Sequence, residues 1–246
     1  MQTWTRRRKW AVATAALIAL ALALAFAAWR ISKSLCFVLV GEVTCRVETP
    51  DPLVALSLDD GPTQQGVDAA LSALDNAHAH ATFFLIGQYA DEEPALVGRI
   101  VASGNEAGNH SYTHRWMMGR SAAFYDDEIV RTSAALRRAG APPPRLFRPP
   151  YGKKLISLPL ALRRHGERMI MWDVWDPDTK DPRAYAADVV RRARPGSIIL
   201  MHLMYSGNDT ARAALPLVLA GLEARGLKVV TVSELLAHAR PGETKR

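Results

Sequence analysis

Short apolar runs alternate with stretches of helical periodicity, and this alternation constrains the fold more than any other feature of the sequence. Val67, Ala70, Leu71 and Leu74, for example, follow the i, i+3, i+4, i+7 spacing of an amphipathic helix. Short apolar strands separated by helices predict a parallel α/β architecture. The seven expected strands are 54–58, 82–86, 106–109, 146–148, 169–172, 197–202 and 228–232, and the expected helices lie around 67–74, 94–104, 129–140, 184–193 and 211–225.

A closed or nearly closed β/α barrel fits this number of strands. A doubly wound open sheet is the alternative, and periodicity alone does not separate the two. The chain has 246 residues, of which 49% are hydrophobic, which is enough for one sizeable core. The proline-rich segment 141–145 reads as a rigid lead-in to a strand rather than a linker, so we expect a single domain over residues 46–240.

The N-terminus has the pattern of a membrane element. Residues 11–29 carry no charge and follow the basic cluster RRRKW. Nineteen apolar residues nearly span a hydrocarbon core of about 30 Å, whereas a secretory signal has an apolar region of about 7–15 residues. We therefore predict a cytoplasmic segment at 1–10, a transmembrane signal-anchor at 11–29 and a stem at 30–45, with the domain exported to the periplasm or cell surface. A long cleaved signal, ending near Ala25-Phe26-Ala27, is the alternative and would give a secreted form.

The net charge of +7 is concentrated at this end of the chain. The first 45 residues hold six basic residues and one acid, and the remainder is nearly balanced. There is no basic stripe interleaved with aromatic residues, so we predict no nucleic-acid partner. The two cysteines, Cys36 and Cys45, lie in the stem, where a disulfide and two unpaired thiols are both open. The oligomeric state is not readable from the sequence.

Polar residues that could bind a metal or transfer protons cluster where the predicted strands end. Asp59 and Asp60 follow the first strand, in SLDDGPT. The carboxyl ends of parallel strands meet at one face of a β/α barrel, which is where such folds build active sites. The others are His110 and His114 after the third strand, Arg148 after the fourth, Asp173, Asp176 and Asp178 after the fifth, and His202 at the end of the sixth.

Two imidazoles and a carboxylate form a ligand set for a divalent metal that leaves coordination positions open for water. His110 and His114 are four residues apart, which places both rings on one side of a turn. One aspartate of the Asp59-Asp60 pair can then bind the metal while the other takes a proton, and the cation offsets their mutual repulsion. For His202, a third metal ligand, a general acid and a core histidine are all open.

On these residues the sequence resembles the polysaccharide deacetylases of carbohydrate esterase family 4, which include chitooligosaccharide and peptidoglycan N-acetylglucosamine deacetylases. The resemblance covers roughly residues 41–238 and implies a distorted barrel of seven or eight β/α units. The matching stretches, in family order, are VALSLDDGP, ATFFLIG, GNEAGNHSYTH, FRPPYG, WDV, PGSIILMH and VVTVSELL.

The resemblance implies a role for each matching residue. Asp59 is similar to the family's catalytic base and His202 to its general acid. Asp60, His110 and His114 are similar to its metal ligands. The site that these ligands form in the family usually holds zinc, and such a set also accepts Co²⁺ or Ni²⁺.

Three further matches concern the groups around the reacting carbonyl. Arg148 is similar to the arginine that holds the base in place. Tyr151 resembles the residue whose backbone N–H stabilises the oxyanion, and Leu200 resembles the wall of the pocket for the acetate methyl.

The fourth family motif, commonly Asp-x-x-Asp-Trp, is altered here to WDVWDPDTKDP. Asp178 follows Trp172 by the usual six residues, so we predict that it pairs with Arg148, with Asp176 as the second candidate. No tryptophan follows either aspartate, and we expect Trp172 or Trp175 to supply the aromatic wall instead.

The function that the resemblance implies is metal-dependent removal of N-acetyl groups from an N-acetylglucosamine-containing polysaccharide, peptidoglycan or chitin-like, with release of acetate. The partners would be that polysaccharide and the membrane. Two alternatives are an O-acetyl esterase acting on an acetylated polysaccharide and a membrane-tethered glycan-binding module whose site has decayed. The intact Asp-Asp pair, His110, His114 and His202 argue against decay.

Overall fold

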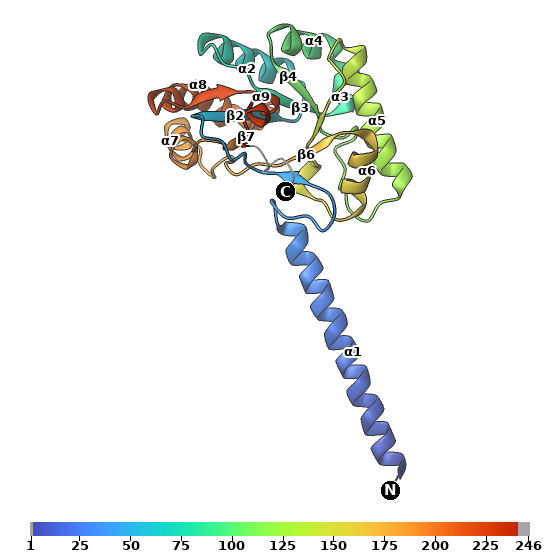
Figure 1. The fold of residues 1–246 in the computed structure, drawn as a ribbon. Helices are drawn as coiled ribbons and strands as arrows, with labels where there is room; N and C mark the ends of the chain where they lie inside the picture. The colour runs from blue at the N-terminus through green and yellow to red at the C-terminus, as the bar shows by residue number, and fades with distance from the viewer. Residues whose placement is uncertain (1, 241–246) are drawn as a thin grey trace.

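A parallel β-sheet that curls on itself organises the computed structural model, which describes residues 2–240 (Figure 1). The strand order is β1-β6-β5-β4-β3-β2-β7, and β8 pairs with the first residues of β2. Within the described residues the strands are β1 (Val43–Thr44), β2 (Leu53–Asp59), β3 (Thr82–Leu85), β4 (Glu106–Asn109), β5 (Leu146–Phe147), β6 (Arg168–Ile170), β7 (Ile198–His202) and β8 (Lys228–Val230).

The two ends of the sheet approach each other without forming a continuous ladder. Arg46, just after β1, makes an isolated bridge to Ser197, and Val174, just after β6, makes another to Ile199 in β7. The predicted distorted β/α barrel is therefore confirmed, as a curled sheet whose seam is joined by single bridges. All seven predicted strands are present as β2–β8, whereas the two-residue β1 is too short to leave a pattern in the sequence.

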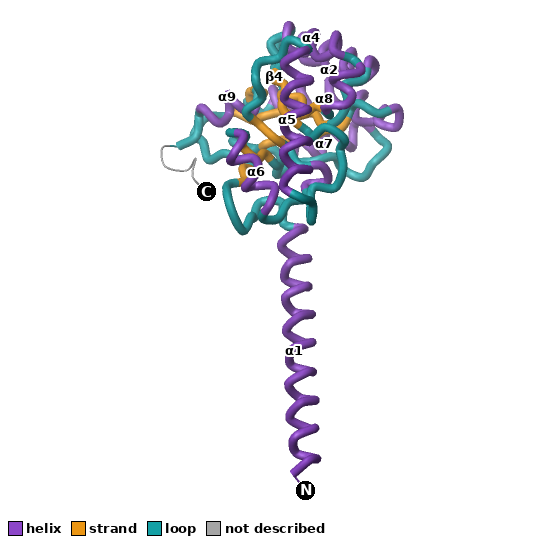
Figure 2. Tube along the Cα trace, turned by 90° about the vertical axis from the view of Figure 1, so that its right-hand side faces the viewer, coloured by secondary structure: helices purple, strands orange, loops and turns teal. Residues whose placement is uncertain are grey.

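Helices cover the outside of the sheet (Figure 2). The five predicted helices are present, whereas α3, α6 and α9 were not predicted. α3 and α9 have six residues each, which is too short for a clear helical period. The helices are α1 (Gln2–Lys33), α2 (Gln64–Asn76), α3 (Gly87–Glu92), α4 (Pro94–Ala102), α5 (Ala122–Arg138), α6 (Ser157–His165), α7 (Pro182–Arg192), α8 (Asp209–Ala224) and α9 (Val232–Ala237), with 3₁₀ turns at Pro150–Gly152 and Ser206–Asn208.

The central strand β2 is buried along its whole length and alternates between two apolar clusters. Val54, Leu56 and Leu58 pack outward under the helices, in the largest core cluster. Leu53 and Ala55 point the other way, into a smaller cluster. Because side chains of a strand alternate between its faces, Ser57 and Asp59 share the side of Leu53 and Ala55.

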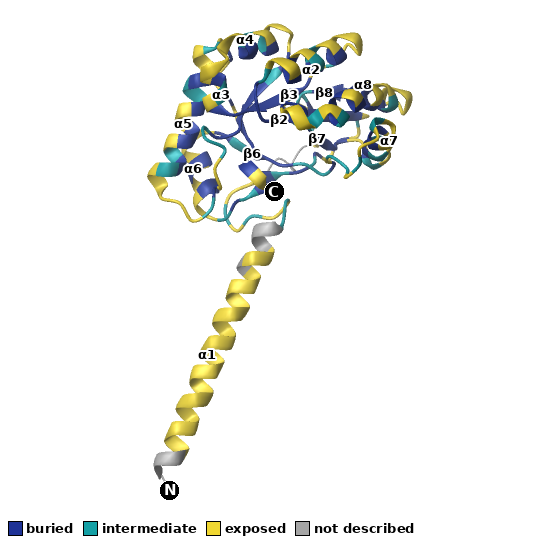
Figure 3. Cartoon of the chain, turned by 180° about the vertical axis from the view of Figure 1, so that it is seen from behind, coloured by how far each residue is buried: buried dark blue, intermediate teal, exposed yellow. Residues whose placement is uncertain are grey.

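Helix α1 stands away from the domain and is exposed along its described length (Figures 1 and 3). Its apolar window, Thr5–Ala27, has a mean hydropathy of 2.3, and none of it is buried. This is one helix long and apolar enough to cross a membrane, and its position near the N-terminus also fits a signal sequence. The window contains most of the predicted span and begins six residues before it.

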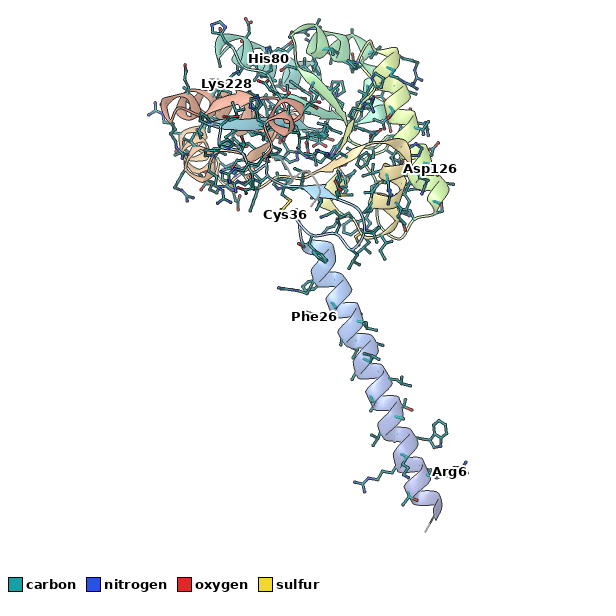
Figure 4. All side chains as sticks on the ribbon, viewed as in Figure 1. Arg6, Phe26, Cys36, His80, Asp126 and Lys228 are labelled. Atoms are coloured by element: carbon teal, nitrogen blue, oxygen red, sulfur yellow. A yellow bond between two sulfur atoms is a disulfide. The ribbon has the colours of Figure 1, made fainter. Side chains whose placement is uncertain are left out.

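The stem folds back onto the domain instead of forming a free linker. Cys36 and Cys45 form a disulfide, which decides between the two states left open by the sequence (Figure 4). Leu35 and Val38 pack against the cluster that includes Phe147, Leu158 and residues of α5 and α6. The segment between α1 and β1 is thus part of the packed structure.

We expect the double variant Cys36→Ser/Cys45→Ser to unfold more easily than the parent protein. The two cysteines are nine positions apart, and closing a loop of that size restricts the unfolded chain. The free energy of unfolding should fall by about 2–3 kcal/mol, as measured by urea denaturation of the domain. Parent protein treated with a reductant should show the same loss, and an unchanged midpoint in both samples would contradict the pairing.

Candidate active site

The two adjacent aspartates face different groups because the chain changes direction between them. Asp59 is the last residue of β2, and its side chain points into the barrel. Asp60 has a backbone φ of 77°, in the left-handed region that non-glycine residues rarely occupy. The turn directs Asp60 toward His110 and His114, whereas Asp59 faces Arg148. One strand end thus supplies a carboxylate to the histidines and another to the arginine.

Arg148 lies fully buried at the centre of the site, with none of its surface exposed. Its Nη1 donates to Asp59 Oδ1 at 2.6 Å and to Ser57 Oγ at 2.8 Å. The remaining nitrogens donate to backbone carbonyls, Nε to Ile170 at 3.3 Å and Nη2 to Met171 at 3.0 Å. A guanidinium that is removed from water needs such partners for its charge and its N–H groups. Arg148 therefore holds Asp59 in place.

The predicted pairing of Arg148 with Asp178 is wrong. The acceptors of Arg148 are the groups just described, and Asp178 is exposed. The bridge between Val174 and Ile199 carries the segment after β6 along β7, so this segment runs beside His202 instead of crossing to Arg148.

Asp176, the second candidate, is also not a partner of Arg148. Its Oδ2 lies 2.6 Å from Nδ1 of His202, and its Oδ1 accepts the His202 backbone N–H at 3.1 Å. The Tyr185 hydroxyl donates to the same carboxylate. The altered fourth motif thus orients the histidine at the end of β7.

Asp60, His110 and His114 converge with the geometry of a metal site. Nε2 of His114 lies 3.3 Å and Nε2 of His110 lies 3.6 Å from Asp60 Oδ1. Asp60 Oδ1 is buried and makes no hydrogen bond, and an anionic oxygen without a partner is costly in the interior. All three ligand atoms lie within 4.8 Å of one another, so these residues fit a divalent cation.

A hydrogen bond to the backbone sets the tautomer of His110. Its Nδ1 lies 2.7 Å from the backbone oxygen of Arg148, which can only accept a hydrogen bond, so Nδ1 carries the proton and Nε2 presents its lone pair. Burial lowers the pKa of His110 to about 4, which keeps the ring neutral as a ligand must be. Burial and the neighbouring Asp59 raise the pKa of Asp60 to about 7. A cation bound beside Asp60 would favour its carboxylate form and so lower this pKa again.

Asp59 and His202 have pKa values shifted in opposite directions. Burial raises the pKa of Asp59, but the charge and hydrogen bond of Arg148, together with the charge of His202, outweigh burial and hold that pKa below its usual range. Burial lowers the pKa of His202, but the hydrogen bond to Asp176 and the charge of Asp59 outweigh it and raise that pKa to about 9. Asp59 and His202 are register partners on β2 and β7. The site thus places a proton acceptor beside a proton donor.

Backbone strain is concentrated at this site. Ser111, His114 and Tyr151 have positive φ values of 63°, 55° and 57°, and Asp60 is a fourth case. Among the described non-glycine residues only His78, with a φ of 48°, adopts this conformation elsewhere. Conformations of this kind persist only where the surrounding structure imposes them.

The remaining predicted residues line the same region to different degrees. Tyr151 is exposed in a 3₁₀ turn after β5, and its ring lies 4.8 Å from that of His114. Leu200 is buried in β7, and Trp172 is half-buried with its ring 5.4 Å from the Arg148 guanidinium. Trp175 is exposed and lies under the guanidinium of Arg192. Their roles toward a substrate stay predictions.

Glu128 in α5 supports the histidine loop and was not identified from the sequence. It is 2% exposed, and its carboxylate accepts the backbone N–H groups of Tyr112 and Thr113 at 2.8 Å each and the Thr113 hydroxyl at 2.6 Å. Both residues lie between His110 and His114. A glutamate on a helix face looks solvent-exposed in the sequence, and only the packing of α5 on this loop reveals its role.

The sequence matches the polysaccharide deacetylase family over residues 46–170. The chain belongs to the polysaccharide deacetylase family. A peptidoglycan-N-acetylglucosamine deacetylase of Bacillus cereus is 31% identical over 205 residues, which is 80% of this chain and 94% of that protein. The family resemblance stated from the motifs is thus confirmed, as is the fold that it implied.

Solved structures show the same family relationship. The crystal structure of a peptidoglycan N-acetylglucosamine deacetylase superposes with a TM-score of 0.76 at 27% identity, over 80% of this chain and 95% of that one. A Bacillus anthracis protein described as a CE4-family pseudoenzyme superposes with a TM-score of 0.75 at 28% identity, over 82% and 71% of the two chains. The fold thus occurs with and without activity, so catalysis by this polysaccharide deacetylase family member depends on its own site residues.

We expect Glu128→Ala to weaken metal binding, because the loop between the two histidines loses the acceptor of three hydrogen bonds. Titration of the chelator-stripped variant with Co²⁺, followed by its visible absorption, should give a dissociation constant about tenfold or more above the parent value.

Glu106→Ala is the matched control for this variant. Glu106 also accepts three hydrogen bonds, from Thr82 Oγ1 and from the backbone N–H and hydroxyl of Ser233, but at the opposite end of β4. It should lower stability without changing the Co²⁺ affinity. An equal loss of affinity in both variants would mean that Glu128 acts only through general stability.

Proposed function

We propose that this protein is a metal-dependent hydrolase that removes N-acetyl groups from an N-acetylglucosamine-containing polysaccharide, peptidoglycan or chitin-like, and releases acetate. The observation that carries the proposal is the convergence of the buried Arg148–Asp59 pair, the Asp60, His110 and His114 ligand set and the Asp176–His202 pair at one end of the barrel. The relatives named as peptidoglycan N-acetylglucosamine deacetylases support the choice of substrate class.

The chain's own residues supply the proton transfers. A divalent transition metal held by Asp60, His110 and His114, zinc with Co²⁺ and Ni²⁺ as alternatives, would polarise the acetamide carbonyl and the attacking water. Asp59, held ionised by Arg148, takes a proton from this water as its oxygen attacks the carbonyl carbon. The Tyr151 backbone N–H donates to the developing oxyanion, and Leu200 lines the pocket for the acetate methyl.

Breakdown of the tetrahedral adduct requires a proton on the leaving nitrogen. His202 carries it, because its Nδ1 is engaged by Asp176 and its Nε2 is left to face the substrate. Transfer of this proton to nitrogen as the C–N bond breaks yields acetate and a free amino sugar. The altered fourth motif supports this step through Asp176, and Trp172 borders the site.

We also propose that α1 anchors the domain to a membrane, with the domain on the exported side. The apolar length of α1, its basic N-terminal cluster and the Cys36–Cys45 disulfide support this localisation. A secreted form cleaved near Ala25–Ala27 remains the alternative, and the mature N-terminus decides between the two.

The activity is tested by measuring acetate release from N-acetylated chitooligosaccharides and from peptidoglycan. The chelator-stripped protein should release none, and Zn²⁺ or Co²⁺ should restore release. Metal-bound protein that leaves both glycans intact, but releases acetate from an O-acetylated polysaccharide, would replace this proposal with an O-acetyl esterase.

Asp59→Asn should reduce turnover by at least 10³-fold, because the amide cannot accept the proton from water. The asparagine oxygen can still accept from Arg148 Nη1, so the chain should fold and bind one equivalent of Co²⁺. Circular dichroism and metal analysis check the fold and the site. A variant with near-parental turnover would remove Asp59 from the role of base.

Asp176→Asn should move the alkaline limit of activity to lower pH. In the parent protein the carboxylate helps raise the pKa of His202 to about 9, so the proton donor persists to mildly alkaline pH and is lost above it. Without that charge the pKa falls, and kcat/KM at pH 8 should drop more than at pH 6.

Asp178→Asn is the control for Asp176→Asn, since Asp178 is exposed and lies two residues along the same segment. Its pH profile should match that of the parent protein. Identical profiles for all three proteins would show that Asp176 does not set the protonation of His202.

A further inference from the structure

Exposed apolar side chains gather where α1 meets the domain. In the described part of the chain outside α1, ten large hydrophobic residues are exposed, and six of them lie in three short segments near this junction. The other four, Val130, Trp175, Tyr205 and Leu217, are scattered over the rest of the domain. We call the six residues the stem face: Phe37, Leu39, Trp116, Tyr151, Ile156 and Leu160.

The segments of the stem face are held together by direct contacts. Lys154 Nζ donates to the Ser34 backbone oxygen at 2.7 Å. A Cβ built on Gly152 would lie 3.2 Å from Leu35 Cδ2, and one built on Gly41 would lie 3.1 Å from Pro159 Cβ. The stem therefore runs along residues 152–159 and is fastened at both ends.

Trp116 joins this surface through the turn after β5. Its ring lies 6.2 Å from that of Tyr151, and Lys153 Nζ lies 5.5 Å from its centroid. Arg115 and Arg120 are exposed on the same loop, and Arg163 is exposed on α6. Aromatic and aliphatic side chains bordered by cationic ones are the composition of a surface that rests in a membrane interface and attracts anionic lipid.

The length of α1 places this surface close to a bilayer. The apolar window ends at Ala27 and the helix at Lys33, six residues later. At 1.5 Å per residue this rise is about 9 Å. The polar headgroup region of one leaflet occupies about 5–8 Å of that distance. A domain packed directly on the end of the helix then has its nearest face at the lipid surface.

We propose that the stem face lies on the surface of the bilayer that α1 enters, and that the mouth of the active site opens beside that surface. Tyr151 belongs to both regions, because its ring also contacts that of the metal-site residue His114. Resting on the proposed function, this orientation assigns the substrate to N-acetylated glycan held at the membrane, such as glycan carried on a lipid.

The lipid contact is tested with the chain from Ser34 onward. This portion contains the complete packed domain, since no part of the apolar window of α1 is buried, and a solved relative matches 80% of this chain over nearly its whole length. Co-sedimentation would be measured with vesicles of phosphatidylcholine alone and of phosphatidylcholine with phosphatidylglycerol at about 3:1. Binding should be several-fold stronger to the anionic vesicles.

Two variants separate the stem face from general stickiness. Phe37→Ser/Leu39→Ser/Ile156→Ser should lose most of the vesicle binding. Val130→Ser/Leu217→Ser removes comparably exposed apolar residues from α5 and α8 and should bind as the parent does. If the parent fails to bind, or if the triple variant binds equally well, the stem face does not contact the bilayer.

Activity measurements distinguish this inference from the proposed function. The triple variant should release acetate from free N-acetylchitotetraose as fast as the parent. In vesicles that carry the full chain, release from N-acetylchitotetraose attached to a lipid in the same vesicle should exceed release from the free tetramer at least tenfold. Equal rates would overturn the membrane-held substrate. Absence of acetate in every sample would instead contradict the deacetylase activity and leave the vesicle result standing.

Discussion

The buried ion pair between Arg148 and Asp59 is the interaction on which the rest of the site depends. A guanidinium with no exposed surface is costly unless its charge and all its donors are satisfied, and removing the partner of such a pair typically costs about 3–5 kcal/mol. The barrel gives each of the three nitrogens an acceptor, using one carboxylate, one hydroxyl and two backbone carbonyls, while the ring of Phe84 lies 4.1 Å from the guanidinium. The strands that bring these acceptors together are thereby fixed relative to each other.

The same arginine organises the groups around it. Its side chain keeps Asp59 ionised, and its backbone oxygen sets the tautomer of His110. Asp59 Oδ2 lies 3.7 Å from His110 Nε2, so the proposed base and the proposed metal ligand are neighbours. Arg148, which directly follows β5, therefore links the proposed proton acceptor to the proposed ligand set, and this explains why the chain tolerates a buried charge here.

A second layer of carboxylates orients the groups to which we assign roles toward the substrate. Asp176 holds His202, and Glu128 holds the loop between the two histidine ligands. The stem adds a third support near Tyr151. Lys154 donates a hydrogen bond to the Ser34 backbone oxygen, and Gly152, which follows Tyr151, lies against Leu35. The segment that follows α1 is thus continuous with the wall of the site.

The sequence by itself determined the parallel α/β architecture, the strand ends that carry the site, and the residue types that chemistry requires there. Apolar periodicity and the four-residue spacing of His110 and His114 are local, so they are readable without a structure. Sequence spacing failed for Asp178, since whether it or Asp176 reaches a partner depends on how the segment after β6 lies along β7.

Only the tertiary structure decided that pairing, the disulfide between Cys36 and Cys45, the support from Glu128 and the packing of the stem beside Tyr151. Each of these joins elements that are separate in the chain or follow an irregular path between strands. The physical reason is that periodicity records which face of an element is buried, whereas contacts between elements depend on register and loop path, which leave no repeating pattern.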